Sequence, residues 1–218
     1  MRFWHDYGKP AFDFVSALVL LLLLWPVILL VGLAVRIWLG PPVLFRQERH
    51  GLRGRKITVL KFRTMEEIHD ELGVPLPDPE RSTPFGLFLR STSLDELPQL
   101  INVLRGEMSL IGPRPLLDRH LPHGVPELFH RDQVRPGITG WAQVNGRNAI
   151  TMTEKFKLDV LYVDRVSLAL DLRIFVLTVF HVLKRTGITE DSSPTPVVTT
   201  TKETITPQND ASWDLDVE

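Results

Sequence analysis

The longest uninterrupted run of apolar positions lies near the N-terminus, where no charged side chain occurs between Phe14 and Val35. A helix of this length and composition can cross a bilayer, and the run is longer than the apolar region of a cleaved signal peptide. Pro26 interrupts the run near its middle and removes one helical hydrogen bond, so the pattern predicts a kink. The kinked helix either crosses the membrane or dips into it and returns to the same face, and composition alone favours crossing.

Shorter elements are predicted downstream of this segment. Residues 57–63 mix β-branched and charged side chains, as is typical of a strand, and they follow a turn at residues 51–54. Residues 66–84 carry acids and four prolines, which indicates either a lid or a plain connecting loop. Residues 154–163 and 170–184 have helical patterns. The apolar stretch inside the second is too short to span a bilayer, so that helix belongs to the core or lies in the membrane interface.

A helix start is predicted beside a pair of acidic residues. Ser93 stands three residues before Glu96, which is the pattern of a capping box, and apolar side chains then recur at helical spacing as far as Leu104. We therefore expect Asp95 and Glu96 in the first turn of an amphipathic helix. The helix dipole favours an ionised carboxylate there, which keeps Asp95 able to act as a nucleophile or a cation ligand.

Charge is distributed unevenly along the chain, although the formal net charge is only -1. Residues 190–218 contain seven acids and one lysine, whereas 24 basic and 19 acidic residues precede them. The composition of this tail predicts disorder, and the basic body suits anionic lipid headgroups and phosphate-bearing substrates. A dense basic band from Arg36 to Arg63 predicts that the body faces the cytoplasm. The chain has no cysteine, so a metal ion would need oxygen or histidine ligands.

An adjacent pair such as Asp95-Glu96 is, by itself, common on solvated helix faces. Two later segments change that interpretation, because residues 106–115 and 135–147 are rich in glycine, proline and arginine. Such segments place backbone N–H groups and guanidinium groups around anions. Together with the apolar N-terminal segment, the pattern favours anion chemistry at a membrane surface.

Six motifs at consistent spacing resemble those of one known family. They are Pro42–Gln47, Lys61–Met65, Leu89–Gln99, Asn102–Pro115, Arg135–Arg147 and Leu158–Tyr162. The chain, from Lys9 to Gly187, resembles the bacterial sugar transferases, and among them the small monotopic phosphoglycosyl transferases that load a sugar phosphate onto a polyprenyl phosphate carrier.

The resemblance implies a covalent mechanism with Asp95 as the nucleophile. Asp95 would attack the β-phosphate of a UDP-sugar, release UMP and form an aspartyl phosphosugar that undecaprenyl phosphate then resolves. Such an attack needs charge neutralisation, supplied by Mg²⁺ held by Asp95 and by basic side chains, while Glu96 orients the metal or activates the incoming phosphate. The expected substrate-binding and phosphate-binding residues are Lys61, Arg90, Arg114, Arg135, Arg147 and Asp159.

Several of these assignments have structural alternatives. Each arginine has an ordinary surface ion pair as its alternative. Asp159 and Asp171 either hold the metal or the basic side chains in place, or form purely structural salt bridges.

The resemblance also implies an architecture and a location. The expected fold is α+β, mainly helical with short strands, with an N-terminal re-entrant helix-break-helix membrane segment and interfacial amphipathic helices. Residues 1–40 would form the membrane segment, residues 41–189 a catalytic domain on the cytoplasmic face of the bacterial inner membrane, and residues 190–218 a disordered acidic tail. Expected partners are a UDP-sugar, undecaprenyl phosphate, membrane phospholipids, downstream glycosyltransferases and a second copy of the chain, with no nucleic acid.

Three functions compete on these observations. The first is a transferase that initiates the assembly of a surface glycan. The second is a non-catalytic membrane adaptor of glycan assembly, against which the intact Asp95-Glu96 pair argues. The third is a phosphohydrolase in which water resolves the aspartyl intermediate. The motifs do not identify the sugar.

Overall fold

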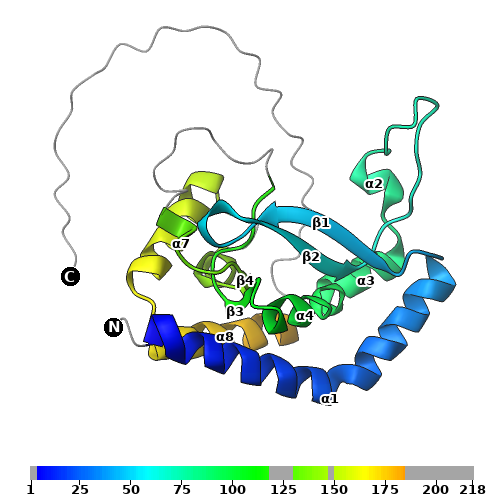
Figure 1. Cartoon of the computed structure of the whole chain (residues 1–218). Helices are drawn as coiled ribbons and strands as arrows, with labels where there is room; N and C mark the ends of the chain where they lie inside the picture. The colour runs from blue at the N-terminus through cyan, green and yellow to red at the C-terminus, as the bar shows by residue number, and fades with distance from the viewer. Residues whose placement is uncertain (1–3, 118–129, 147–149, 185–218) are drawn as a thin grey trace, which may run out of the picture.

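The computed structural model describes residues 4–117, 130–146 and 150–184 (Figure 1). Arg147 and the predicted acidic tail therefore lie outside the described residues. The elements in chain order are η1 (Trp4–Gly8), α1 (Lys9–Trp38), β1 (Leu44–His50), η2 (Leu52–Gly54), β2 (Lys56–Phe62), α2 (Asp78–Arg81), α3 (Pro84–Ser91), η3 (Leu94–Glu96), α4 (Gln99–Leu104), β3 (Ser109–Ile111), β4 (Gly137–Thr139), α6 (Trp141–Asn145), α7 (Met152–Asp164) and α8 (Leu168–Lys184). The prediction of a mainly helical fold with short strands is confirmed.

Helix α1 is the predicted apolar segment, and it continues through Pro26 as one helix that bends along its course (Figure 1). Within the described residues, one helix (Trp4–Trp38) is long and apolar enough to cross a membrane, by length and composition. Its buried residues are confined to two groups near its ends, Lys9, Asp13 and Ala17 in the first half and Val31 and Val35 in the second. The middle of the helix therefore projects apolar side chains away from the rest of the protein.

Polar side chains attach the N-terminal end of α1 to the body. Lys9 Nζ donates to Asp171 Oδ2 at 3.1 Å, and Asp13 Oδ2 accepts a hydrogen bond from Ser109 Oγ at 2.7 Å. Tyr162 Oη donates to the other oxygen of Asp171 at 2.7 Å. These buried bonds join α1 to β3, α7 and α8, so Asp171 has the structural role that the sequence left open.

The C-terminal end of α1 is attached through Arg63, which is 6% exposed. Its guanidinium donates to the carbonyl oxygens of Leu39, Gly40 and Pro41. The last carbonyls of a helix lack partners within the helix, so this side chain supplies donors at that end. Both ends of α1 are thus attached to the same body.

Two small sheets form the strand part of the fold. Strands β1 and β2 pair antiparallel, with Leu44 opposite Phe62 and His50 opposite Lys56, around the predicted turn. Strand β2 and the turn were predicted from the sequence, and β1 was not. Strands β3 and β4 pair in parallel, and their backbones come so close that a Cβ on Gly137 would lie 2.1 Å from the amide nitrogen of Gly112.

The capping-box prediction at Ser93 is wrong. Ser93 has a left-handed backbone conformation with φ of 56° and its side chain makes no cap hydrogen bond. Residues 94–96 form a 3-10 turn, and the regular helix begins only at Gln99. Pro98 explains this, because it has no amide hydrogen to donate back to the carbonyl of Leu94. Asp95 and Glu96 therefore precede α4 and do not lie in its first turn.

Asn102 fixes α4 against β2. It is fully buried, and its side-chain oxygen accepts from the Leu60 amide at 3.1 Å while its side-chain nitrogen donates to Thr58 O at 2.7 Å and to Glu107 Oε2 at 2.6 Å. Because Lys61 follows Leu60 in β2, these bonds also fix the position of Lys61 relative to the turn before α4.

We expect Asn102→Ala to lower the free energy of unfolding by about 2–4 kcal/mol, since buried partners left without a hydrogen bond cost about 1–3 kcal/mol each. Thermal unfolding of the detergent-solubilised protein measures the effect. Asn145→Ala is the matched control, because Asn145 is exposed and makes one bond, to Trp141 O. Equal melting temperatures for the two variants would contradict the assigned role of Asn102.

Candidate active site

The predicted acidic pair lies in the turn η3, where β2 passes beside it. Asp95 is 6% exposed. Lys61 extends from β2, with Nζ 2.7 Å from Glu96 Oε1 and 3.9 Å from Asp95 Oδ2. Arg114, from the segment after β3, brings Nη2 to 3.3 Å from the same oxygen of Glu96. The fold thus gathers two carboxylates and two cations that are far apart in the sequence.

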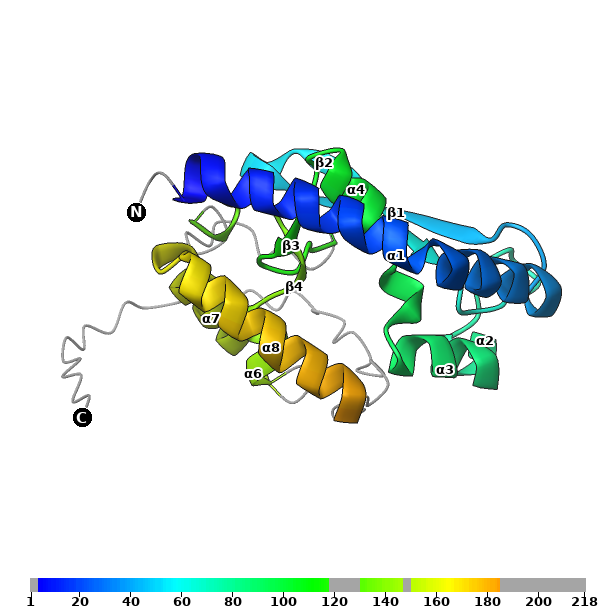
Figure 2. The same ribbon diagram turned by 90° about the horizontal axis from the view of Figure 1, so that it is seen from below.

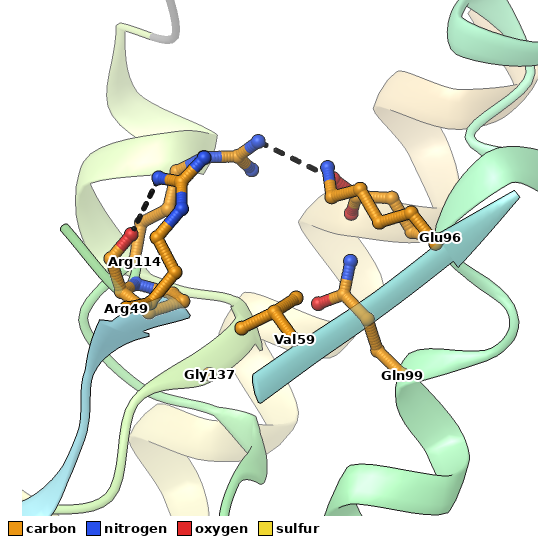
Figure 3. A pocket seen from close by; sticks show the side chains of 8 residues that line it. Arg49, Val59, Glu96, Gln99, Arg114 and Gly137 are labelled. Atoms are coloured by element: carbon orange, nitrogen blue, oxygen red, sulfur yellow. Dashed lines mark hydrogen bonds and ion pairs between the residues drawn. The ribbon is translucent and has the colours of Figure 1, made fainter. Parts of the chain in front are cut away.

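Lys61, Glu96 and Arg114 border a small hollow of about 260 Å³ that opens to solvent, and Asp95 lies next to Glu96 without lining it. It is lined by Arg49, Val59, Lys61, Glu96, Gln99, Arg114, Pro115 and Gly137. Figure 3 shows Arg49 and Arg114 on one side of it and Glu96 on the other, with the Gln99 side chain below the gap between them. Basic groups and an acidic group therefore face one another across this hollow.

The two carboxylates differ in their electrostatic surroundings. Burial raises the pKa of Asp95 to about 6, and the neighbouring charge of Glu96 acts in the same direction. Lys61, Arg114 and Arg90 lower that pKa without cancelling the effect of burial. Burial also raises the pKa of Glu96, but Lys61 and Arg114 outweigh it and hold that pKa at about 2. The expectation that a helix dipole keeps Asp95 readily ionised is therefore wrong, because Asp95 lies outside the helix and is buried.

This arrangement assigns different chemical tasks to the two acids. Glu96 is an ionised acceptor that holds Lys61 and Arg114 at the edge of the hollow. Asp95 is a buried carboxylate whose charge, once it is ionised, is only partly opposed by the neighbouring cations. A carboxylate beside held cations has the surroundings that attack on a phosphorus atom requires.

The residues fit a divalent cation only together with a substrate. Within the part of the chain that the structure describes, no three acidic or histidine side chains come together as a complete metal site. Mg²⁺ is commonly held by one or two carboxylates together with substrate phosphates. The incompletely neutralised Asp95 meets that requirement, with Glu96 beside it.

The remaining predicted basic residues are placed unequally. Arg90 donates from Nε to Thr64 Oγ1 at 2.9 Å, and its charge acts on Asp95, although it does not line the hollow. Arg135 is half-buried just before β4 and is not among the lining residues. The role predicted for Arg147 concerns a position outside the described residues.

Asp159 forms the structural salt bridge that the sequence left as an alternative. It is 4% exposed and accepts from Arg131 Nη2 at 3.0 Å and from Arg131 Nε at 3.2 Å. Arg131 Nη2 also donates to the backbone oxygen of Arg114 at 2.6 Å. Asp159 therefore acts on the site through Arg131, and the structure places it away from the lining of the hollow.

Sequence reasoning missed Arg49 and Gln99 as residues of the site. Gln99 ends the motif that contains Asp95, and Arg49 follows directly after the motif ending in Gln47. Only the pairing of β1 with β2 brings Arg49 to the hollow, and β1 was not predicted from the sequence.

Comparison with known proteins identifies the family of the chain. The model of the family described as bacterial sugar transferase matches residues 4–185. The chain is 49% identical over 187 residues to the uncharacterized sugar transferase EpsL of Bacillus subtilis, covering 86% of this chain and 93% of that protein. It is 45% identical to the UDP-glucose:undecaprenyl-phosphate glucose-1-phosphate transferase of Xanthomonas campestris, covering 81% of this chain and 39% of that protein.

The chain belongs to the bacterial sugar transferase family, and it is an enzyme. It matches relatives of two sizes. It spans 39% of the length of the X. campestris transferase and 96% of the length of the exopolysaccharide production protein PSS of Rhizobium leguminosarum, to which it is 39% identical.

We expect the acidic pair of the metal-free protein to titrate in two well-separated steps. As the pH falls through about 6, Asp95 takes up a proton because burial raises its pKa, whereas Glu96 stays ionised to about pH 2. Carboxyl carbon chemical shifts measured by NMR follow both groups, and Asp95→Asn identifies the first step by removing it. An Asp95 midpoint near pH 4 would contradict the electrostatic assignment.

Proposed function

We propose that this enzyme transfers a sugar 1-phosphate from a UDP-sugar to undecaprenyl phosphate, releases UMP and thereby initiates the assembly of a surface glycan. The observation that carries the proposal is the buried Asp95 beside Glu96, with Lys61 and Arg114 held at the hollow. The names of the X. campestris and Escherichia coli relatives, which are 45% and 43% identical, describe transfer of glucose 1-phosphate to undecaprenyl phosphate.

The proposed reaction has two displacement steps at one phosphorus atom. An oxygen of Asp95 attacks the β-phosphorus of the donor, and the bond from that phosphorus to the bridging oxygen breaks, so that UMP leaves with the bonding electrons. A phosphate oxygen of the carrier then attacks the same phosphorus atom. The bond to Asp95 breaks, which restores the carboxylate and leaves the sugar diphosphate on the carrier.

The basic residues of the hollow serve this reaction by opposing the charge of the diphosphate. Lys61 and Arg114 are already oriented by Glu96, so little side-chain ordering remains when the donor binds. Mg²⁺ held by Asp95 and the donor would supply further neutralisation of phosphate charge when it is bound.

We also propose a re-entrant course for α1, with the body on the cytoplasmic face of the inner membrane. Two features support it. Both ends of α1 are attached to the same body, through Asp171 and Ser109 at one end and Arg63 at the other. A helix of about 45 Å, by the usual rise per residue, could not cross the bilayer and keep both attachments on one side.

Helix α8 supports the same placement. Figures 1 and 2 show α1 and α8 along one face of the molecule, with the β1–β2 hairpin on the opposite side. The apolar side chains that α8 exposes are Leu168, Leu172, Phe175, Val176, Val179 and Phe180. A helix of this length with exposed apolar residues suits the membrane interface, which is one of the two placements that the sequence left open.

Nucleotide release tests the reaction. We expect UMP to form from one member of a UDP-sugar panel that includes UDP-glucose and UDP-galactose, in the presence of Mg²⁺ and undecaprenyl phosphate. Asp95→Asn should lower turnover at least about 1000-fold, since an amide is a poor nucleophile, while membrane association and unfolding temperature stay unchanged. UMP formed at the same rate without the carrier would indicate a phosphohydrolase, and a folded wild-type protein inactive with every donor would favour the adaptor.

Topology is tested with single cysteines, which the cysteine-free chain permits. We expect His5→Cys to react with an impermeant maleimide only from the cytoplasmic side, as should the control Arg55→Cys in the exposed turn between β1 and β2. Pro26→Ala restores a helical donor and should move position 5 toward the opposite side. Labelling of His5→Cys from the periplasmic side in the otherwise unchanged protein would refute the re-entrant course.

A further inference from the structure

The segment that carries Arg114 is held at three successive carbonyl oxygens. Those of residues 114, 115 and 116 accept hydrogen bonds from Arg131 Nη2 at 2.6 Å, from Arg49 Nη1 at 3.0 Å and from the His50 amide at 3.0 Å. We call residues 114–116 the Arg114 segment. The donors come from both sides of it, two of them from β1.

All three guanidinium nitrogens of Arg49 donate hydrogen bonds within the protein. Nε and Nη2 donate to Gln47 Oε1, at 3.0 Å and 2.5 Å, while Nη1 donates to the Arg114 segment. Gln47 and Arg49 are two residues apart in β1, so their side chains project from the same face of the strand. The planar group is therefore oriented by Gln47 and directed at a backbone oxygen, although Arg49 also borders the hollow.

The opposite side of the Arg114 segment is fixed by a buried ion pair. Arg131 and Asp159 are 2% and 4% exposed, and their side chains are bonded at 3.0 Å. An Arg131 held in this way is a fixed donor. The contacts on the other side of the Arg114 segment come from β1, through the Arg49 side chain and the His50 amide.

We propose that Arg49 is a positioning residue: oriented by Gln47, it holds the Arg114 segment so that the Arg114 side chain reaches Glu96 and the donor's diphosphate. The inference rests on the proposed function, because Arg114 is assumed to serve phosphate transfer. It differs from a direct role of Arg49 in phosphate binding, which would not require its bond to the backbone oxygen of the Arg114 segment.

A substitution that keeps the charge and removes the planar group separates the two roles. Arg49→Lys should lower kcat/KM about 10-fold to 100-fold, the usual result of a small misplacement of a group that acts on the substrate. Gln47→Ala should give a loss in the same direction. Arg55→Lys is the matched control and should retain wild-type kcat/KM. Full activity of Arg49→Lys would overturn the proposal in favour of simple charge.

Coupling to Arg114 distinguishes positioning from a general loss of structure. If Arg49 acts through Arg114, then Arg49→Lys should change kcat/KM less than about 3-fold in an Arg114→Ala background, because effects transmitted through one residue are not additive. The same fold-loss in both backgrounds would overturn the proposal. Unfolding temperatures of all variants identify any that fail to fold.

Hydrogen exchange tests the positioning without any substrate, so the outcome does not depend on the proposed reaction. The His50 amide donates to the Arg114 segment, and Arg49→Lys should speed its exchange while leaving the Ser109 amide, which bonds to Pro136 O, unchanged. Unchanged exchange at His50 would overturn the inference. A wild-type protein that releases no UMP, but shows the expected exchange, would instead contradict the proposed function alone.

Discussion

The architecture depends on one electrostatic constraint, which is that two adjacent carboxylates withdrawn from water cannot both stay ionised unless cations face them. The fold satisfies this constraint unequally. Lys61 and Arg114 are both bonded to Glu96, and Asp95 keeps a charge that is only partly opposed. Asn102 contributes by fixing the strand that carries Lys61 against α4. The packing around the turn therefore leaves one carboxylate paired with two cations and its neighbour only partly opposed.

Local sequence patterns predicted those helices and strands whose formation depends on residues close together in the sequence. Helices α7 and α8, strand β2 and the turn before it were all predicted, because each depends on residues within a few positions of one another. The capping box failed for an equally local reason, since the missing donor at Pro98 outweighs the Ser93 signal. Strand β1 was missed because charged and polar side chains, from Arg46 to Arg49, occupy most of it.

The site was predicted as a set of residues, but its geometry was not. The local patterns and the family resemblance pointed to Asp95, Glu96, Lys61 and Arg114, which the fold brings together. They could not reveal that Asp159 pairs with Arg131, 28 residues away, because no motif joins the two. The sequence also did not show that α1 packs with the body. Two hydrophobic clusters of the described residues contain side chains of α1, Ala17 in one and Val35 in the other.

The buried bond between Lys9 and Asp171 has a consequence for how the protein is made. The two residues are 162 positions apart, so α1 leaves the ribosome long before its polar partner exists. Asp13 can meet Ser109 once β3 is made, but Lys9 lacks its partner Asp171 until α8 is synthesised. The N-terminal end of α1 therefore gains its last polar contact only when α8 is made, and α8 completes the folding of the N-terminus.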